Sequence, residues 1–509
     1  MKRASVLVLS LGLFAGCAGD DDGAYMGSSD GAWYPPGADA GVAYDSSPMA
    51  DGSAAAPVDP EDYGKWVEND WIETATEPLS TFGIDVDTAS YSLTRQSLNQ
   101  GVLPDPQSVR VEEHINYFKY DYPQPTEGPF SINMEGAPSK FGQGYDLLRI
   151  GLQGLEVPAD QRKPANLVFL IDVSGSMSDA NKLPLVKGAL SYLVEQLMPT
   201  DTLGIVAYGT TVTELLQPTT VTNKAAILTA IGELAAGGAT AGGPGIQKAY
   251  AMAKGAFITG GINRVILCTD GDFNVGLSGS ALVTLVEEQR DEGVTLSVLG
   301  FGMGNYQDTF LEDLSNKGNG NYAYIDSQKE AEKVFGEKLL GTLQVIAKDV
   351  KVQIEFNKLT VKKYRLVGYE NRLLMPDDFE DDSKDGGEIG SGHRVTAFYE
   401  MEVIGTPVPN DILATVRFRY KEPDGTVSKE LTRVIRFEEL GASFEQASPD
   451  FRFAAAVVEL AEILRHSKHS QGALFDQVWS IAAATAGNDP DRLELVGLVD
   501  KAKALWPGQ

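Results

Sequence analysis

The sequence predicts an α/β protein with a doubly wound, mainly parallel sheet, flanked by a small α+β N-terminal module and a C-terminal module of β-sheet plus helices. Two observations support this prediction. Between Asn166 and about Leu343, short apolar runs alternate with amphipathic segments, as in a parallel sheet covered on both faces. From Ala347 onward, apolar and polar residues alternate one by one, which is typical of antiparallel strands.

Composition limits the function classes. The chain has 509 residues, of which 43% are hydrophobic, so it can bury a sizeable core in more than one domain. Its formal charge of −29 argues against nucleic-acid binding, because the phosphate backbone attracts Lys and Arg. Residues 18–62 hold nine Asp and one Glu without Lys or Arg, among many Gly, Ala, Ser and Pro. This segment is predicted to be a disordered acidic tether.

Residues 1–17 have the character of a lipoprotein signal peptide. A basic start is followed by a short apolar stretch, too short to span a bilayer. The stretch ends at Leu13-Phe14-Ala15-Gly16-Cys17, which resembles a bacterial lipobox with Phe14 where leucine is commoner. An ordinary secretory signal is the alternative. We expect Cys17 to be lipidated and to anchor the chain in a bacterial cell envelope, and Ala18 after it favours the outer membrane.

Residues 63–160 are the predicted α+β module. Strands are expected at 81–87, 130–135 and 147–152, and helices at 88–99 and 111–120. Within this module, the stretch Asp85-x-Asp87-Thr88-x-Ser90 contains carboxylates and hydroxyls close together, so it is a candidate metal site. The stretch lacks a glycine turn and a long buried strand, so a strand end followed by a helix N-cap is the preferred interpretation.

Residues 165–345 are the predicted α/β domain. Strands are expected at 166–172, 202–208, 211–216, 263–269, 294–300 and 321–325, and helices at 183–197, 224–234, 244–254, 281–292 and 328–343. The strand at 211–216 follows its predecessor after a tight turn. It is therefore predicted to be an antiparallel edge strand.

Residues 346–509 are the predicted β-rich and helical module. Strands are expected at 349–356, 364–369, 394–403, 414–420 and 432–437, and helices begin after Ser448-Pro449 and Asp489-Pro490. The acidic segment 377–388 fits no EF-hand spacing, so a solvated loop is preferred to a calcium loop. Glu462, His466 and His469 could line one helical face as metal ligands, but a basic helix end is the simpler interpretation.

Oxygen-bearing side chains follow two of the buried strands. The run Leu167–Ile171 ends in Asp172-Val173-Ser174-Gly175-Ser176, and a later run ends in Thr269-Asp270. A glycine-rich loop, residues 237–243, carries Thr240 before a helix, and it lacks the Lys-Ser/Thr pair of a phosphate loop. Because open α/β sheets bind ligands at the carboxyl ends of their strands, these groups are expected to form one site. The predicted ligands are Asp172, Ser174, Ser176, Thr240 and Asp270.

This set of donors points to a hard cation. Oxygen ligands without His or Cys suit Mg²⁺, with Mn²⁺ or Ca²⁺ as alternatives, and they disfavour zinc. The two carboxylates balance the charge of the ion and the hydroxyls are neutral. The ion therefore retains capacity for one more anion, such as a carboxylate from a protein partner.

The order Asp172-x-Ser174-x-Ser176, Thr240, Asp270 resembles the metal-ion-dependent adhesion site of von Willebrand factor type A domains, which have a Rossmann-like fold, over residues 165–343. The resemblance implies that both aspartates act partly through waters and that the hydroxyls ligate directly or switch with state. Residues 80–122 and 364–372 resemble the flanking modules of YfbK-like bacterial lipoproteins.

Together these features predict a lipid-anchored envelope protein that binds a protein partner through its metal and is not an enzyme. A metal-assisted hydrolase is one alternative, with Asp272 as the nearby candidate base. An envelope protein whose metal only stabilises the fold is another.

Overall fold

The computed structural model describes residues 66–507 except 240–241, 272–278, 303–307, 339–340, 342, 406, 471 and 473. The described residues all belong to one compact unit, Ala55–Gln509. The expected signal peptide with Cys17, the expected tether, Thr240 and Asp272 lie outside them. Within the described ranges, no helix is both long enough and apolar enough to cross a bilayer.

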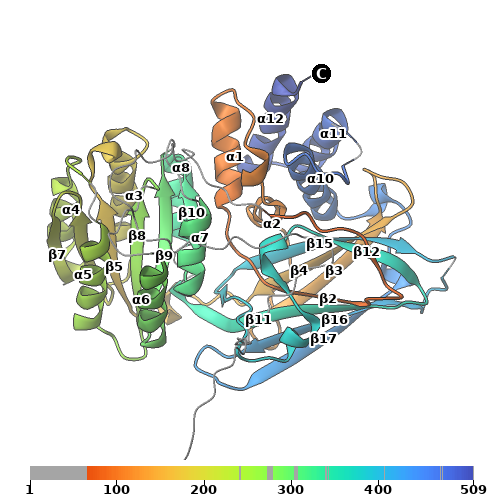
Figure 1. Cartoon of the computed structure of the whole chain (residues 1–509), viewed down its shortest axis with the longest axis horizontal. Helices are drawn as coiled ribbons and strands as arrows, with labels where there is room; N and C mark the ends of the chain where they lie inside the picture. The colour runs from red at the N-terminus through yellow and green to blue at the C-terminus, as the bar shows by residue number, and fades with distance from the viewer. Residues whose placement is uncertain are drawn as a thin grey trace, which may run out of the picture. The chain divides into compact units, whose positions relative to one another are not determined.

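A mainly parallel sheet forms the centre of the α/β domain (Figure 1). Its spatial order is β10 (Tyr322–Ile325), β9 (Thr295–Phe301), β8 (Ile262–Thr269), β5 (Ala165–Asp172), β6 (Thr202–Tyr208) and β7 (Val212–Thr220). Neighbouring strands are parallel up to β6, and β7 pairs with β6 in the antiparallel sense. The doubly wound sheet and its antiparallel edge are thus as the sequence predicts.

Side chains of β5 alternate between two cores, one on each face of this sheet. Leu167, Phe169 and Ile171 pack with α3 (Leu183–Gln196), α4 (Lys224–Glu233) and α8 (Gln328–Glu332). Val168 and Leu170 pack with α5 (Gly242–Gly255), α6 (Gly279–Asp291) and α7 (Asp308–Lys317). Burial on both faces explains why this strand is a continuous apolar run.

Two antiparallel sheets pack face to face outside the α/β domain. One has the order β1 (Ile72–Glu73), β12 (Val361–Val367), β15 (Arg394–Val403), β4 (Asp146–Gly154) and β3 (Phe130–Pro138). The other has the order β13 (Leu373–Leu374), β2 (Leu79–Gly83), β11 (Val345–Phe356), β16 (Ile412–Lys421) and β17 (Ser428–Arg436), with β14 (Ile389–Gly390) paired to β11. Their facing side chains, among them Ile150, Ile354 and Phe418, share one core.

The segments before and after the α/β domain share both of these sheets. β2 pairs with β11, and β4 pairs with β15, in each case joining strands from opposite sides of the domain in sequence. The sequence predicts separate modules at 63–160 and 346–509, whereas strands of both segments lie within common sheets. Periodicity within a strand does not identify its partner, so this exchange leaves no local signal.

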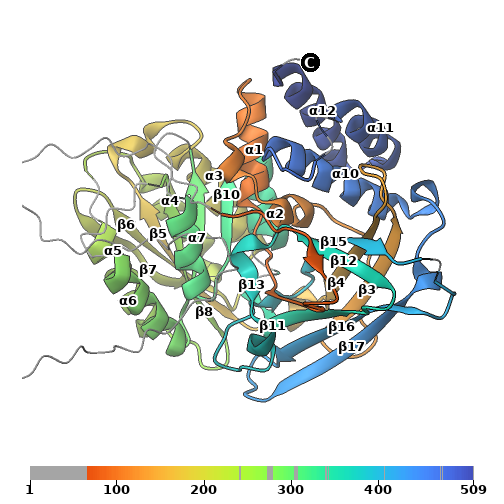
Figure 2. The ribbon, with the colours of Figure 1, turned by 45° about the vertical axis from the view of Figure 1, so that its right-hand side comes forward.

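Helices cover the outer face of the sheet formed by β1, β12, β15, β4 and β3. α10 (Pro449–Leu464), α11 (Phe475–Thr485) and α12 (Pro490–Leu505) form a group that is seen in both views (Figures 1 and 2). They share a core with α1 (Ala89–Asn99), α2 (Val111–Asn116) and sheet residues such as Phe398. Ser448 and Asp489 cap α10 and α12 through their side chains, as predicted.

One expected helix differs in the structure, and one helix was not expected. The segment 328–343 is predicted as one helix, but α8 ends at Glu332 and a π-helix, Lys333–Lys338, follows. α7 is not predicted at all. Its buried residues include Asp308, Glu312 and Ser315 beside two leucines, so its sequence lacks a clean apolar stripe.

Candidate metal site

The first part of the predicted site lies at the carboxyl end of β5. Asp172 is the last residue of this strand, which runs between β6 and β8. Its Oδ1 accepts a hydrogen bond of 2.7 Å from the backbone N–H of Ser174, and the Ser174 and Ser176 hydroxyl oxygens are 2.9 Å apart. Asp172 and Ser174 are buried, whereas Ser176 is exposed. The motif is therefore a preformed turn with one hydroxyl facing solvent.

The second part lies at the end of the neighbouring strand β8. Ile171 pairs with Cys268 in the parallel register, so β8 ends at Thr269 and Asp270 follows it close to the point where Asp172 ends β5. Asp270 is buried, and its Oδ2 accepts a hydrogen bond of 2.9 Å from Nζ of Lys182. The structure thus brings the two predicted carboxylates to one edge of the sheet, where the charge of Asp270 acts on Asp172.

The glycine-rich loop is hydrogen-bonded to the Asp172 turn. The N–H of Gly237 donates to the Val173 carbonyl at 2.8 Å, and the N–H of Gly175 donates to the Gly238 carbonyl at 2.9 Å. Gly238 has a φ of +84°, and a Cβ there would lie 2.0 Å from Oγ1 of Thr210, so glycine is required. These hydrogen bonds hold the loop against the Asp172 turn as far as Ala239, the last described residue before Thr240. Thr240 itself lies outside the described residues, and its role stays a prediction.

The donors present fit a divalent cation. Oδ2 of Asp172 and Oδ1 of Asp270 are buried, and neither accepts a hydrogen bond of good geometry from a described residue. Burial raises the pKa of Asp172 to about 6, Asp270 adds to the rise, and the Ser174 hydrogen bonds and the Tyr208 hydroxyl oppose it. Two buried carboxylate oxygens without partners are costly unless a cation or a proton joins them. Beside neutral hydroxyls, they form the oxygen set that Mg²⁺ prefers.

Within the described part of the α/β domain, the hydrolase alternative finds no histidine that could act as a base. All four histidines, at positions 114, 393, 466 and 469, belong to the flanking segments. His114 is buried between the Arg110 carbonyl and the Thr94 hydroxyl, and burial lowers its pKa to about 4. Asp272, the base considered from the sequence, lies outside the described residues.

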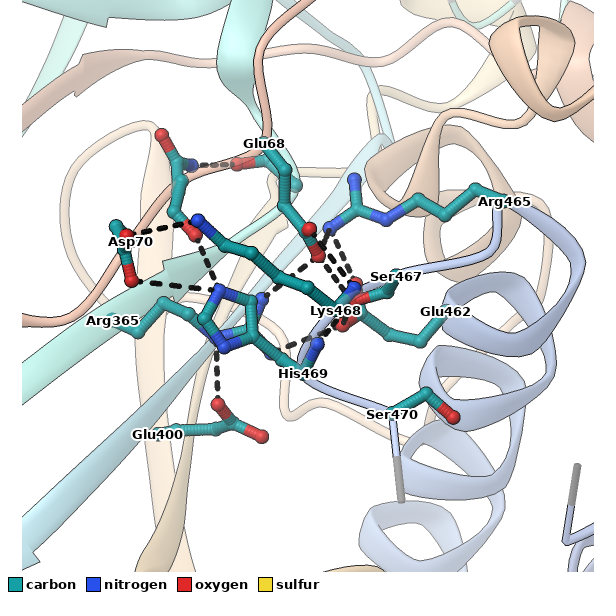
Figure 3. Close-up of polar contacts among 12 residues, drawn as sticks. Glu68, Asp70, Arg365, Glu400, Glu462, Arg465, Ser467, Lys468, His469 and Ser470 are labelled. Atoms are coloured by element: carbon teal, nitrogen blue, oxygen red, sulfur yellow. Dashed lines mark hydrogen bonds and ion pairs between the residues drawn. The ribbon is translucent and has the colours of Figure 1, made fainter. Parts of the chain in front are cut away.

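The metal site considered at Glu462, His466 and His469 does not form on a helical face, because α10 ends at Leu464. His466 has a φ of +58° and its ring packs against Trp506. The carboxylate of Glu462 instead pairs with Arg365 and Arg465, in a network that also contains Glu68 and Glu400 (Figure 3). These contacts place the Glu462 carboxylate among guanidinium groups at the end of α10, where the sequence favours a basic helix end.

A second acidic cluster lies where α7 meets the flanking segments. Carboxylate oxygens of Asp85, Glu113 and Glu312 are all within 4.8 Å of one another and are buried. Arg110 pairs with Glu113, and Arg372 approaches Asp85 at 3.3 Å. Two guanidinium groups therefore already supply positive charge here. The Asp85–Ser90 stretch takes part in this ion network, which the sequence did not reveal because its members are far apart in the chain.

A cavity of about 440 Å³ lies away from Asp172. Its lining includes Asp87, Tyr322, Arg162 and Lys333. Arg162 pairs with Asp201, and Lys333 is bonded to a carboxylate at 2.7 Å. These two cations of the cavity lining are therefore already neutralised by carboxylates.

Known protein families match the chain in three regions. Residues 166–337 match the von Willebrand factor type A domain, and residues 57–149 match a family described as von Willebrand factor. Residues 341–411 and 406–505 match the C-terminal region of the uncharacterized protein YfbK. The chain is 37% identical over 471 residues to the uncharacterized protein YfbK of Escherichia coli (strain K12), which covers 87% of this chain and 81% of that protein. This chain belongs to the YfbK family.

More distant similarities concern part of the YfbK-family chain. The uncharacterized protein sll0103 of Synechocystis is 33% identical over 201 residues, covering 39% of this chain and 46% of that protein. A solved von Willebrand factor type A protein from Catenulispora acidiphila aligns with a TM-score of 0.43 and 15% identity, over 74% of this chain and 91% of that one. The α/β domain of this YfbK-family protein is a von Willebrand factor type A domain.

Proposed function

We propose that this YfbK-family protein binds a protein partner through a divalent ion, preferably Mg²⁺, held at the edge of its type A domain. The observation that carries the proposal is the pair of buried oxygens, Oδ2 of Asp172 and Oδ1 of Asp270, beside the Ser174 and Ser176 hydroxyls. When bound, the ion would supply a positive charge at the protein surface. Ser176 is exposed, so the site can be reached by another molecule.

The partner is proposed to offer a carboxylate. Hydroxyl ligands hold a cation without neutralising it, so an anionic side chain from outside can complete the coordination. The net charge of −29 repels an acidic partner at long range, but salt screens this repulsion beyond about 8 Å. Contact at the metal can therefore outweigh the repulsion between the two molecules.

We further propose that Cys17 carries a lipid that anchors the protein in the bacterial envelope, with Ala18 favouring the outer membrane. The acidic segment 18–62 would then act as a spacer of on the order of 35 Å between the anchor and the folded region. Replacement of Cys17 by alanine is expected to move the protein from the membrane fraction to the soluble fraction. Retention of the variant in the membrane would contradict the anchor.

The proposed binding function is tested by affinity capture from envelope extracts with Mg²⁺ or with EDTA. Wild type is expected to capture partners only with Mg²⁺, and Asp172→Ala to lose them. Asp291→Ala is a matched control, because Asp291 is an exposed aspartate at the end of α6. Partners that are retained in EDTA, with a lower melting temperature, would favour a purely stabilising metal. Turnover of ester or phosphoester substrates that is lost in Asp172→Ala would favour the hydrolase.

A further inference from the structure

A buried lysine contacts the proposed metal site. Lys182 immediately precedes α3, and its side chain reaches across to Asp270, with Nζ 2.9 Å from Oδ2. Only 8% of Lys182 is exposed. Lysine is almost never buried to this extent unless its charge is paired.

The aliphatic stem of Lys182 packs against Gly302, where any side chain would occupy the same space. Gly302 follows β9 with a φ of +74°, and a Cβ there would lie 2.2 Å from Cε of Lys182. The Gly302 carbonyl also accepts a hydrogen bond from the Tyr324 hydroxyl, which fixes the backbone at this point. A side chain at position 302 would displace the lysine stem. The contact between Lys182 and Asp270 is therefore determined by the packing around the stem.

The two carboxylate oxygens of Asp270 have different surroundings because Lys182 contacts only one of them. Oδ2 is held by the ammonium group, while Oδ1 is buried without a hydrogen-bond partner among the described residues. Asp172 and Asp270 carry two negative charges, and the ammonium group returns one positive charge to the site. With Lys182, the two carboxylates and a divalent cation together have a net positive charge. Without Lys182, the two carboxylates would balance the cation and leave no net charge.

We infer that Lys182 is a positioning and charge-setting residue of the metal site, which weakens binding of the metal and strengthens binding of the anion that joins it. This inference rests on the proposed metal site. The ammonium group repels a cation at Asp172 and attracts a carboxylate that approaches the cation from outside. Binding of the anion and of the metal should therefore be coupled, and by linkage each should strengthen the other.

The inference is tested with the mature chain, using Mn²⁺ as the probe and electron paramagnetic resonance to measure free Mn²⁺, with and without acetate. Lys182→Met and Lys182→Gln both remove the charge and keep a side chain of similar length, so either folded variant decides the result. Each is expected to bind Mn²⁺ on the order of tenfold more tightly than wild type, since a nearby positive charge is gone. Acetate should tighten Mn²⁺ binding by wild type and have a much smaller effect on the variants.

Two further variants separate a charge effect from a structural effect. Lys182→Arg keeps the positive charge and should resemble wild type. Lys224→Met removes an exposed lysine of the same domain, one that pairs with Glu195, and should change neither quantity. A melting temperature that falls while Mn²⁺ affinity and the acetate effect stay at their wild-type values would overturn the role of Lys182. Absence of Mn²⁺ binding by wild type would instead overturn the metal site itself.

Discussion

The guanidinium of Arg95 is bonded at two points to the carboxylate of Asp326, with N–O distances of 2.7 and 2.5 Å. Arg95 lies on α1 of the flanking region, and Asp326 follows β10 of the type A domain. Glu330 of α8 adds a third contact at 2.9 Å. These side chains are almost fully buried, so the domain and its flank are joined by ionic groups withdrawn from water.

Replacement of Arg95 by methionine should therefore be strongly destabilising. The change keeps most of the side-chain volume but leaves Asp326 and Glu330 buried without their cation, which costs about 3–5 kcal/mol. Urea unfolding followed by circular dichroism should show this loss. Lys224→Met, which breaks an exposed ion pair, should cost less than about 1 kcal/mol.

The double variant Arg95→Met with Asp326→Asn gives the sharper comparison. Removal of both charges relieves the unpaired carboxylate, so the double variant should be more stable than Arg95→Met alone. If the two losses simply add, the pair does not act as a coupled unit.

The buried charge of Asp172 predicts a crossover in stability. Burial raises the pKa of this carboxyl to about 6, so near pH 7 its negative charge opposes folding when no cation is bound. Asp172→Asn keeps an oxygen that can accept the Ser174 N–H and removes the charge. In EDTA the variant should therefore be more stable than wild type, on the order of 2 kcal/mol.

Addition of Mg²⁺ should reverse this order. A ligand at 100 times its dissociation constant stabilises the folded state by about 2.7 kcal/mol, and only wild type keeps both carboxylates. Melting curves of the two proteins with Mg²⁺ and with EDTA measure the effect. Equal shifts of both proteins would place the stabilising Mg²⁺ elsewhere in the chain.

Glu459 of α10 predicts a dependence of stability on pH. Burial, reinforced by the charge of Glu462, raises the pKa of Glu459 from 4.5 to about 8. Because the folded state holds the proton more tightly, this stabilisation is complete below about pH 4.5 and is lost as the pH rises to 8. Glu459→Gln removes the effect and can still accept the Ser470 hydroxyl, which lies 3.1 Å away.

The free energy of unfolding of Glu459→Gln should exceed that of wild type by more at pH 8 than at pH 5, with a difference on the order of 2 kcal/mol. Urea unfolding at the two pH values measures it. A constant difference between the proteins would mean that Glu459 does not titrate in this range.

Arg465 predicts how the start of the folded chain is held. Its side chain is fully buried and contacts Glu68 (Figure 3). It also pairs with Glu370 and lies over the Trp66 ring. Arg465→Met should destabilise the protein by about 3–5 kcal/mol and expose the segment around Glu68 to proteases. Limited proteolysis with identification of the cleavage sites is the measurement.

Lys468 provides the control for this network. It is exposed and pairs with Asp70, so Lys468→Met should leave the cleavage pattern unchanged. Cleavage near residue 68 at the same rate in both variants would show that Arg465 does not hold the segment.

The sequence identifies the parts of the site that depend on local pattern. The run before Asp172 is apolar at every position because β5 is buried on both faces, and its polar end stands out. The apolar run of β8 ends in the same way, at Thr269 and Asp270. Lys182 could not be recognised, because a lysine before an amphipathic helix resembles a solvated one. The glycine that makes room for its stem, Gly302, lies more than a hundred residues later.

In the fold too, features set by local sequence could be predicted and contacts between distant segments could not. Strands and most helices follow from periodicity, whereas α7 was missed because Asp308 and Glu312 are buried against Arg110 of the flank. The pairing of β2 with β11 could not be predicted either, since both are ordinary alternating strands. What the sequence conceals are contacts between segments that are distant in the chain.

The pairing of β2 with β11 also bears on how the protein is made. Ser80 meets its partner Ile354 roughly 270 residues later, after the whole type A domain has been synthesised. The type A domain can fold as soon as it emerges, because its strands and helices follow one another directly. β2 has an unpaired edge until the second half of the chain has been synthesised. Unpaired strand edges favour misassembly.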